Sequence, residues 1–509
     1  MQFCQNKIMR RLFLLLCACY LICSGYSPNS SKVFAKPVSE RILVVTLDDR
    51  PVNIDYPLYL AEENEITISD ALHKESFTER IETIENELKT GKFNAIVISF
   101  DNLLYGGLME SRVVEQPLSE IEKKRIINLL EYVKENKITA YAYTTSQRVT
   151  TNVITSDDLE KYNNYMEKNK VLTKGNFMSS TQTSFVLHEE DNLYYQHRAN
   201  KVRDTLFLLE EATEYFQEFY VGQDDTQPSG IQKYELHSLK NAAINENIHF
   251  VNGTDELIST LIYKVKSEGE KPKVYMYITS ETDFSRTILP YEGVTLENLL
   301  IEKQQIFDFN FVNLDMADYV WIIHNGKTFN QAEVYDLLKS KKTIMVTDLN
   351  INNPTHQLIS DLFQNNLQAI SNIDVYCSWN TASNMIGLTL SQGFLRKENP
   401  NNQKLLEKRI LKDYLYSSNL SHEIRQLFKE DIVDQYNFEN PLINEYIESE
   451  MNEFLKNILK TSTQVDKVIF PWNRLFEIMI DFNEEINLSK CIVAGEYLLS
   501  YEEAGVCDK

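Results

Sequence analysis

The chain has 509 residues, of which 43% are hydrophobic, which is enough for more than one hydrophobic core. Its formal net charge is -23, and no cluster of basic residues offsets this charge. A surface this acidic repels nucleic acids and anionic membranes, so the composition argues against a nucleic-acid partner.

The first 35 residues have the layout of a secretory signal peptide. Three basic residues precede the apolar run Leu12–Cys23, which is too short to span a bilayer, and Val33–Ala35 supplies a small-residue cleavage pattern. We therefore expect a secreted or cell-surface protein. Lipoprotein processing, with a lipid anchor on Cys19, is the less favoured alternative. No later stretch approaches the about 20 apolar residues of a membrane helix, so no membrane span is expected.

Outside this leader, the chain has the cysteines Cys377, Cys491 and Cys507. Three cysteines in a chain of this length do not make a disulfide framework, and none has the CxxC spacing of a zinc site. A bridge between Cys491 and Cys507 stays open, and buried or unpaired thiols are the favoured interpretation.

In the first half of the remaining chain, apolar strand patterns alternate with helical ones. The expected strands cover 42–47, 65–69, 95–100, 138–144, 220–222 and 248–251, and the expected helices lie near 81–88, 118–136 and 202–219. Repeated βαβ units predict a parallel sheet with helices on both faces. A polar insertion at 150–199 is too long for an ordinary loop, so it is a lid or partly helical.

The second half repeats the alternation and ends in helices. Strands are expected at 274–279, 319–324, 343–346 and 375–379, and the charged segment 404–459 predicts helices. No internal sequence repeat is visible.

From these patterns we expect an α/β protein with two Rossmann-like, doubly wound lobes and a helical C-terminal region, and a (β/α)8 barrel is the alternative. The expected domains are a signal peptide at 1–35, an N-terminal lobe at 36–265, a second lobe at 266–400 and a mainly helical region at 401–509.

The segment RILVVTLDDRPVN (41–53) places polar residues directly after a buried strand. The apolar run ends in Asp48, Asp49 and Arg50, and Pro51 and Asn53 lie near the start of an expected helix. Ligands of open α/β sheets bind beyond the carboxyl ends of the strands. This segment therefore predicts part of a binding crevice.

The segment AIVISFDNLLYGGLMESR (95–112) follows the same pattern. Its strand ends at Asp101, a loop carries Tyr105, Gly106 and Gly107, and Arg112 follows. Paired glycines allow a left-handed backbone or close approach of a ligand, although a tight turn alone also explains them. Phosphate-binding and dinucleotide-binding glycine motifs are absent at the strand ends.

A third strand, in FYVGQDDTQPSGIQKYE (219–235), ends in Asp224 and Asp225. Adjacent side chains of a strand point to opposite faces, so at most one member of each Asp pair needs to face the crevice. Asp101, Glu281 and Asp348 lie at similar strand ends. If these strands lie side by side, their carboxylates come close together at one edge of the sheet, where they must share protons, pair with basic side chains or bind a cation. The basic candidates are Arg50, Arg112 and Arg148.

The fourth segment, VYCSWNTASN (375–384), leads from a strand into an expected helix. Asn380 or Thr381 would cap this helix and leave backbone amides facing the crevice, with Trp379 and Asn384 nearby. Further on, 470–474 reads FPWNR, an aromatic platform beside an amide and a guanidinium that suits sugar binding or plain packing.

Together these segments resemble, in order from about 41 to about 480, the motif blocks of a bacterial family known as domain of unknown function 4127. The resemblance implies an α/β protein without an assigned activity. The motif positions are Asp48, Asp49, Arg50, Asn53, Asp101, Tyr105, Gly106, Gly107, Arg112, Asp224, Asp225, Trp379, Asn380, Thr381 and Asn384. Arg148 lies in a weaker block.

Three functional hypotheses follow. The favoured one is a carbohydrate hydrolase in which Asp101 and one of Asp224 or Asp225 form the acid and base pair, arginines orient the substrate and Trp379 stacks on a sugar. The second is a metal-dependent ester or phosphate hydrolase, with Asp48, Asp101 and Asp224 as ligands of Mg²⁺, Mn²⁺ or Ca²⁺. The third is an exported solute-binding protein without catalysis. No cofactor other than such a divalent cation is expected.

Overall fold

The computed structural model describes residues 41–62, 64–150, 152, 189–228, 230–267, 269, 271–280, 283–326, 328–349, 357–396, 401–429, 440–483, 492–494 and 497–499. All of them belong to one unit, residues 39–509. The expected signal peptide with Cys19, most of the insertion at 150–199, Glu281, Cys491 and Cys507 lie outside the described residues.

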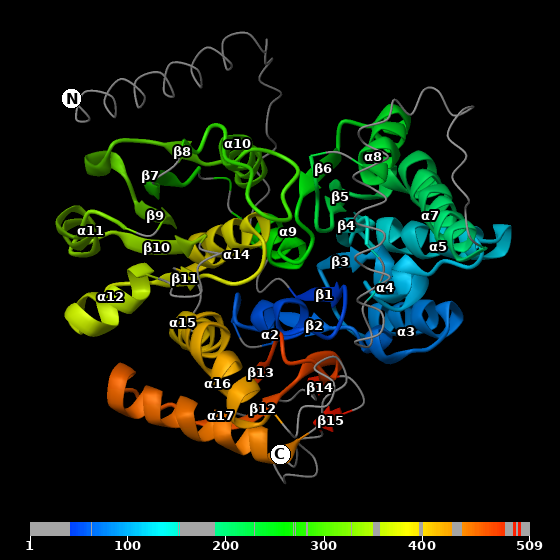
Figure 1. Ribbon diagram of the computed structural model, residues 1–509. Coiled ribbons are helices and arrows are strands. Elements are labelled where there is room, and N and C mark those ends of the chain that lie inside the picture. Colours follow the sequence, from blue (N-terminus) through cyan, green and yellow to red (C-terminus); the bar gives the residue numbers. More distant parts are fainter. Residues whose placement is uncertain are drawn as a thin grey trace. The chain divides into compact units, whose positions relative to one another are not determined.

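The first sheet has six parallel strands, in the order β2-β1-β3-β4-β5-β6 (Figure 1). Their bounds are β1 (Ile42–Val45), β2 (Ile66–Ile68), β3 (Ala95–Ser99), β4 (Thr139–Ser146), β5 (Glu218–Gln223) and β6 (Ile248–Asn252). β1 and β3 are buried throughout, as expected for strands that are covered by helices on both faces.

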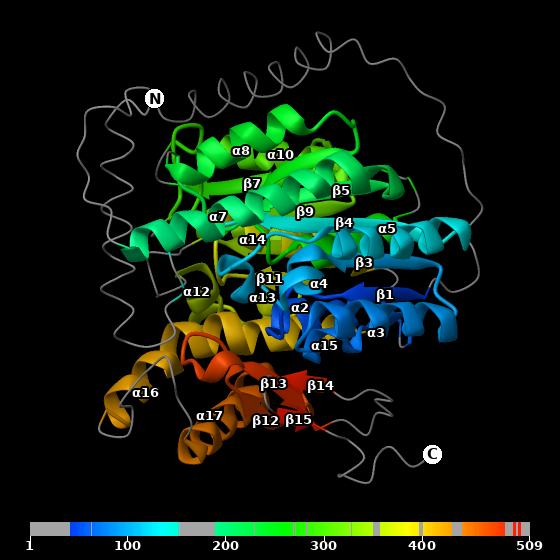
Figure 2. The same ribbon diagram turned by 90° about the vertical axis from the view of Figure 1, so that its right-hand side faces the viewer.

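Helices connect these strands and cover both faces of the sheet. They are α2 (Pro51–Leu58), α3 (Phe77–Thr90), α4 (Phe100–Tyr105), α5 (Glu120–Glu135), α7 (Glu189–Phe207), α8 (Ile231–Ala242) and α9 (Leu257–Lys266), with the short helical turns η1 (Asp70–His73), η2 (Glu110–Arg112), η3 (Leu208–Ala212) and η4 (Thr213–Tyr215). α3 and α5 begin at capping boxes formed by Ser76 with Glu79 and Ser119 with Glu122. Figure 2 shows α3, α5 and α7 in front of β1, β3 and β4.

The second sheet has five parallel strands, in the order β11-β10-β9-β7-β8. Its strands are β7 (Lys273–Ser280), β8 (Asn310–Phe311), β9 (Tyr319–Asn325), β10 (Thr343–Asp348) and β11 (Val375–Cys377). Its helices are α10 (Leu296–Phe307), η5 (Leu314–Met316), α11 (Gln331–Leu338), α12 (Gln357–Asn365), α13 (Leu367–Ile370) and α14 (Ala382–Leu395).

The two sheets share one strand order although the sequence shows no repeat. When the strands of each sheet are numbered from 1 in chain order, the first five strands of both sheets lie in the order 2-1-3-4-5, which is that of flavodoxin-like doubly wound proteins. The first sheet adds a sixth strand at its edge. The expected fold class, two doubly wound α/β lobes, is confirmed. The strands of the two sheets lie within 42–252 and 273–377, and the domain boundaries at 265 and 400 stay predictions.

The C-terminal region begins with helices. They are α15 (Asn402–Arg409), the π-helical η7 (Ile410–Leu420), α16 (Ser421–Leu427), α17 (Pro441–Phe454) and the π-helical η8 (Leu455–Leu459). The antiparallel strands β12 (Val465–Ile469) and β13 (Met479–Phe482) flank the short η9 (Pro471–Asn473), and β14 (Ile492–Ala494) pairs with β15 (Tyr497–Leu499). In the described part of the chain, no helix combines the length and the apolar character that crossing a membrane requires.

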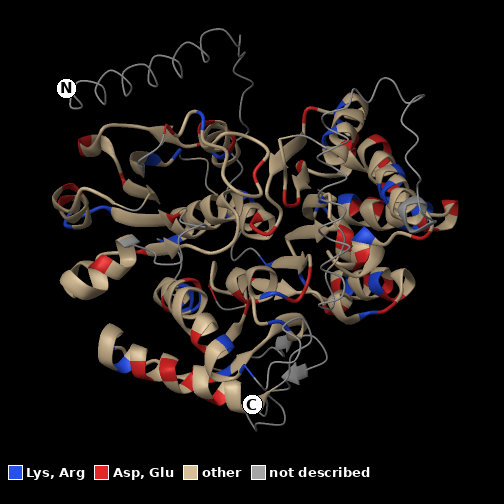
Figure 3. Ribbon diagram, in the orientation of Figure 1, with Lys and Arg blue, Asp and Glu red and all other residues tan. Residues whose placement is uncertain are grey.

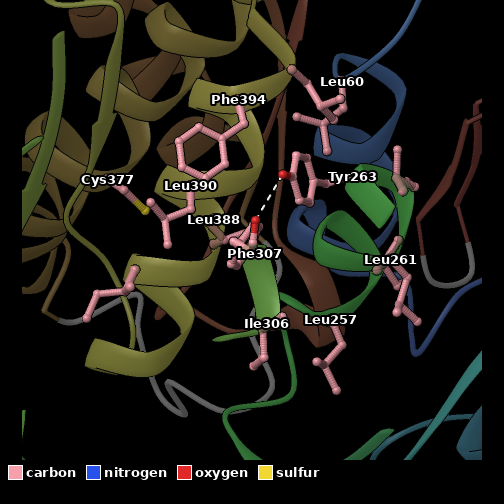
Figure 4. Close-up of a cluster of buried hydrophobic side chains, with 14 of the residues drawn as sticks. Leu60, Leu257, Leu261, Tyr263, Ile306, Phe307, Cys377, Leu388, Leu390 and Phe394 are labelled. Carbon is pink, nitrogen blue, oxygen red and sulfur yellow. Dashed lines mark hydrogen bonds between the residues drawn. The ribbon is translucent and has the colours of Figure 1, made fainter. Parts of the chain in front are cut away.

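A continuous core joins the two sheets. One cluster of buried side chains includes Val97 of β3, Leu261 of α9, Met385 of α14 and Trp321 of β9. In Figure 4, the Tyr263, Phe307 and Phe394 rings of this cluster lie together, with ring centroids 5.1 to 6.0 Å apart. The Tyr263 hydroxyl donates to the Phe307 carbonyl at 3.0 Å. The paired helices α9 and α14 therefore contribute to one core that both sheets share.

Two elements of the structure differ from those expected from the sequence. Residues 100–105, expected as the end of a strand and a loop, form α4, because the Ser99 side chain caps the Asn102 amide and Gly106, at φ 102°, closes the helix. The helix expected at 202–219 ends earlier, and Phe219 lies in β5, where the aromatic and β-branched run from Phe219 to Val221 favours a strand.

Candidate functional site

A cavity of about 520 Å³ lies at the carboxyl ends of strands from both sheets. The first sheet contributes Arg50 after β1, Arg148 after β4, the pair Asp224 and Asp225 after β5, and Asp255 after β6. The cavity is therefore at the edge where the sequence predicted a ligand crevice.

The second sheet and the C-terminal region supply the other walls. Residues 378–381 line the cavity directly after β11, and Tyr291 reaches it from the segment between β7 and α10. Ser417, Ser421 and Arg425 come from η7 and α16, and residues 474–476 follow Trp472 of η9. Three parts of the chain that are far apart in sequence thus meet at one cavity.

Arg50 is the centre of a buried network on the cavity wall. Its Nη2 donates to Asp48 Oδ2 at 2.8 Å and to Asp255 Oδ1 at 2.6 Å, and its Nη1 donates to Asp255 Oδ2 at 3.1 Å. Asn53 Nδ2 donates to Asp48 Oδ1 at 2.7 Å, and Asn380 Nδ2 donates to Asp255 Oδ2 at 2.6 Å. Asp48 and Asn53 therefore hold Arg50 from behind, while Asp255 and Asn380 lie on the cavity wall.

Two further arginine and aspartate pairs line the same cavity. Arg112 Nη2 contacts Asp224 Oδ2 at 2.5 Å, and both side chains are almost fully buried. Arg148 Nη1 contacts Asp225 Oδ2 at 3.0 Å, and this pair is more exposed. Both members of the Asp224 and Asp225 pair line the cavity, contrary to the alternation expected within a strand. They lie in a turn after β5, where Asp225 has φ 39°.

The ionisation of Asp224 and Asp225 is shifted in opposite directions. Burial opposes ionisation of Asp224, but the Arg112 and Arg148 guanidinium groups outweigh it and hold the pKa of Asp224 below its usual range. Burial raises the pKa of Asp225, and the negative charge of Asp224 raises it further. The two neighbouring carboxyls therefore lose their protons in different pH ranges, Asp224 before Asp225.

Aromatic side chains form one wall of the cavity. The Trp379 and Phe476 rings are stacked, with centroids 6.1 Å apart, and the Trp472 ring lies 6.3 Å from Phe476. Lys412 Nζ lies 3.9 Å from the centroid of Trp379, and the Arg50 guanidinium lies 4.9 Å from that of Trp472. The aromatic platform expected at 470–474 therefore contributes Trp472 to the cavity, and a sugar ring can stack on such a surface.

The N-terminus of α14 lacks the side-chain cap that was expected from Asn380 or Thr381. Thr381 is the N-cap residue but makes no side-chain cap, and Asn380, at φ 82°, accepts from the Thr381 amide through Oδ1 at 2.9 Å. One backbone amide of this helix start, that of Ser383, donates to Glu292 Oε1 at 2.7 Å. Glu292 is buried, and burial raises its pKa to about 8.

Replacement of Glu292 by Gln should reduce the pH dependence of stability. Native Glu292 keeps its proton up to about pH 8, whereas the unfolded chain loses it near the ordinary value of 4.5, so the free energy of unfolding falls as pH rises through this window. Each pKa unit corresponds to about 1.4 kcal/mol, so we expect the wild type to lose a few kcal/mol more than Glu292→Gln between about pH 5 and pH 9. Denaturant midpoints of both proteins across this range measure the difference, and parallel curves would contradict the assignment.

Asp101 does not line the cavity. It is fully buried and accepts from the Thr145 amide at 2.7 Å and from the Thr145 hydroxyl at 2.8 Å. Lys201 Nζ binds its Oδ1 and also donates to Ser111 Oγ at 2.7 Å. The structure therefore places Asp101 in a closed ion-pair network beside the cavity rather than in its wall.

Several other predicted site residues do not line the cavity. The Tyr105 hydroxyl donates to Asp204 Oδ2 at 2.8 Å, and Gly106 and Gly107 have φ values of 102° and 154°. A Cβ atom on Gly107 would lie 2.7 Å from Glu110 Oε2, so this glycine permits a tight turn rather than contact with a ligand. Asn384 donates to Asp255 Oδ2 at 3.4 Å. Asp49 is buried and lies outside the cavity lining.

The carboxylates proposed as metal ligands bind three different cationic side chains. Asp48 binds Arg50, Asp101 binds Lys201 and Asp224 binds Arg112. Among the residues that the structure describes, no group of three or more His, Cys, Asp or Glu side chains is arranged to hold a metal ion. The expected ligand set is therefore not assembled.

The sequence patterns did not single out Asp255, Arg425 or Tyr291 as site residues. Asp255 follows β6 in the segment NGTDE, so the rule of polar residues after an apolar strand applies to it as well. Arg425 lies on a helix in a charged tail, and no local signal marks it. Only the packing of α16 beside the sheet edges brings it to the cavity.

Comparison with known proteins places the whole described core in one family. Residues 42–481 match the profile of the family described as "Protein of unknown function (DUF4127)". No curated protein sequence matches the chain. A solved structure described as "Crystal Structure of AHE enzyme from Alicyclobacillus herbarius" aligns with 68% of this chain and 89% of that chain at 8% identity. Its TM-score of 0.18 is too low to support an argument about fold or function.

Proposed function

The chain belongs to the DUF4127 family, and from the geometry of its cavity we propose that it is an exported hydrolase that cleaves glycosidic bonds. The observation that carries the proposal is a pair of neighbouring carboxyls in one cavity beside an aromatic wall, with the pKa of Asp224 lowered and that of Asp225 raised. Glycoside hydrolysis needs this combination, because one carboxyl donates a proton and another acts as base or nucleophile.

In this proposal, Asp225 is the general acid. Its proton passes to the glycosidic oxygen as the bond between this oxygen and the anomeric carbon breaks. Asp224 stays ionised and has one of two roles: it attacks the anomeric carbon and forms a glycosyl-enzyme that water then hydrolyses, or it takes a proton from the water that attacks this carbon. Among the described residues, its side chain is bound only through Oδ2, by Arg112, so Oδ1 is available for this role.

The remaining lining residues would bind the sugar. Trp379 and Phe476 offer a stacked aromatic surface, and Asn380 and Thr381 add polar groups beside it. Arg148 would hold Asp225 in place through the contact at 3.0 Å. Asp101, which sequence patterns favoured as one of the two catalytic carboxyls, has no role in the reaction as proposed here.

Export belongs to the proposal and is supported by the leader pattern around Leu12–Cys23. An anchor on Cys19 would leave the same enzyme at the cell surface. A small saccharide fits a cavity of this size, since ligand pockets of about 300–1,000 Å³ are typical of small molecules.

Assays of reducing-end release from a panel of α- and β-linked glycosides test the proposal. The wild type should turn over at least one class, and the double variant Asp224→Asn/Asp225→Asn should not. Asp336→Asn, which removes an exposed carboxylate on α11, serves as the matched control and should keep full activity. Sugar binding without turnover by the wild type would instead favour a solute-binding protein.

A further inference from the structure

The cavity has a charge opposite to that of the protein as a whole. The chain carries 51 Lys and Arg against 74 Asp and Glu, and Figure 3 shows acidic residues on helices across the described structure. Among the described residues, the cavity is lined by five arginines, three aspartates and no lysine or glutamate. A basic cavity in an acidic protein is therefore a local feature and does not follow from composition.

Each aspartate of the lining is bound by an arginine of the same lining. Arg50 contacts Asp255 at 2.6 Å, and Arg112 and Arg148 bind Asp224 and Asp225. The negative charge of the lining is thus matched within the first sheet. The C-terminal region contributes two further arginines to the lining, Arg425 and Arg474.

Arg425 is suited to bind a ligand rather than a neighbouring side chain. Its Nη1 donates to the Ser421 carbonyl, one turn earlier, at 2.8 Å, and it has no carboxylate partner among the described residues. Ser417, Ser421 and Arg425 are spaced four residues apart and all line the cavity. They form a polar stripe with a guanidinium at one end.

Arg474 is positioned by an aromatic side chain. Its guanidinium lies 5.4 Å from the centroid of the Trp472 ring, whose other neighbours are Phe476 and the Arg50 guanidinium. A guanidinium at this distance from an indole ring is attracted by the electrons of the ring, which favours this position of the Arg474 side chain.

We propose that the saccharide bound in this cavity carries a negative charge, on a carboxylate or sulfate group that Arg425 recognises. The assignment rests on the proposed function for the saccharide part of the ligand. A guanidinium binds either anion through parallel N–H···O bonds, which are about twice as strong as bonds between neutral groups. The aromatic wall holds the apolar face of the ring, and the arginines of the C-terminal region hold its charged substituent.

Binding measurements with matched acidic and neutral sugars test this inference without relying on turnover. The probes are glucuronate with glucose, galacturonate with galactose, and glucose 6-sulfate, measured by calorimetry or by the shift in melting temperature. The wild type should prefer the charged member of each pair. Arg425→Gln should weaken binding of the charged sugars by about 10- to 100-fold and leave the neutral sugars unchanged.

The variants need a control for stability and for bulk charge. Arg125→Gln removes an arginine that pairs with Glu82 on the surface, away from the cavity lining, and should bind like the wild type. Arg474→Gln is a second variant at the site and should shift the preference in the same direction as Arg425→Gln. Melting temperatures without ligand show that each variant is folded.

The possible outcomes separate this inference from the proposed function. Preference for charged sugars without turnover of any glycoside would support the charged ligand and overturn the hydrolase. Turnover of neutral glycosides alone, or equal binding within each matched pair, would overturn the charged ligand. A preference that survives in both Arg425→Gln and Arg474→Gln would also overturn it. Comparison of glucuronate with glucose 6-sulfate distinguishes the two anionic groups.

Discussion

The Asp225→Asn variant should lose about 100- to 10,000-fold in kcat on the glycoside that the wild type hydrolyses best. This range is the usual contribution of a general acid, and the asparagine side chain keeps the size of Asp225 but has no proton of suitable acidity to donate. KM should change little, because Arg148 and the aromatic wall remain. Steady-state kinetics measures both quantities, and a loss of less than about tenfold would remove Asp225 from the role of acid.

The pH profile gives the same assignment a second readout. Activity of the wild type should fall at high pH as Asp225 ionises, at a pH above the ordinary value for Asp because its pKa is raised by burial and by Asp224. It should fall at low pH only when Asp224, whose pKa is lowered, becomes protonated. The residual activity of Asp225→Asn should lack the alkaline limb, whereas that of Asp224→Asn should lack the acidic limb. The two limbs belong to a coupled pair, so they are assigned from both variants together.

The Lys201→Met variant should lose about 3 to 5 kcal/mol of stability. Lys201 is buried and binds Asp101, Ser111 and Thr145, and Met fills a similar volume without the charge. The Asp101 carboxylate would then be buried without a cation. Chemical denaturation measures the change as a shift of the midpoint.

A double variant and a surface control separate the ion pair from general disruption. Lys201→Met/Asp101→Asn removes both charges and should be more stable than Lys201→Met alone. Lys123→Met breaks an exposed pair with Glu120 and should cost less than about 1 kcal/mol. Stability of Lys201→Met within about 1 kcal/mol of the wild type would show that Asp101 does not depend on Lys201 for its charge.

The fold could be predicted from sequence because the signals were local. Apolar runs such as 42–47 and 95–100 marked strands buried on both faces, and the polar residues after them marked the edge where the cavity lies. The strand order could not be predicted, because the pairing of strands depends on contacts between residues far apart in the sequence, and local patterns carry no information about these contacts. Their shared order 2-1-3-4-5 emerges only from the pairing of the strands.

The candidate site was predictable only in part, for a similar reason. Asp101 and Asp224 look alike in sequence, since each follows an apolar strand. They differ because Lys201, 100 residues after Asp101, closes the space around it, whereas Asp224 meets Arg112 at the cavity. Asp255 and Arg50 are 205 residues apart and are brought together only by the order of the strands. The charge of the cavity also depends on Arg425, whose position is set by packing of the C-terminal helices.

The position of Trp472 against Arg50 has a consequence for how the protein becomes active. A wall of the cavity is completed by residues 472–476, which lie more than 400 positions after the first strand of the sheet that they contact. Contacts of such sequence separation form late in folding, since a long loop must close before they stabilise anything. On the proposed function, an enzyme exported as an unfolded chain would therefore stay inactive until residues 472–476 reach Arg50, after the rest of the chain has folded.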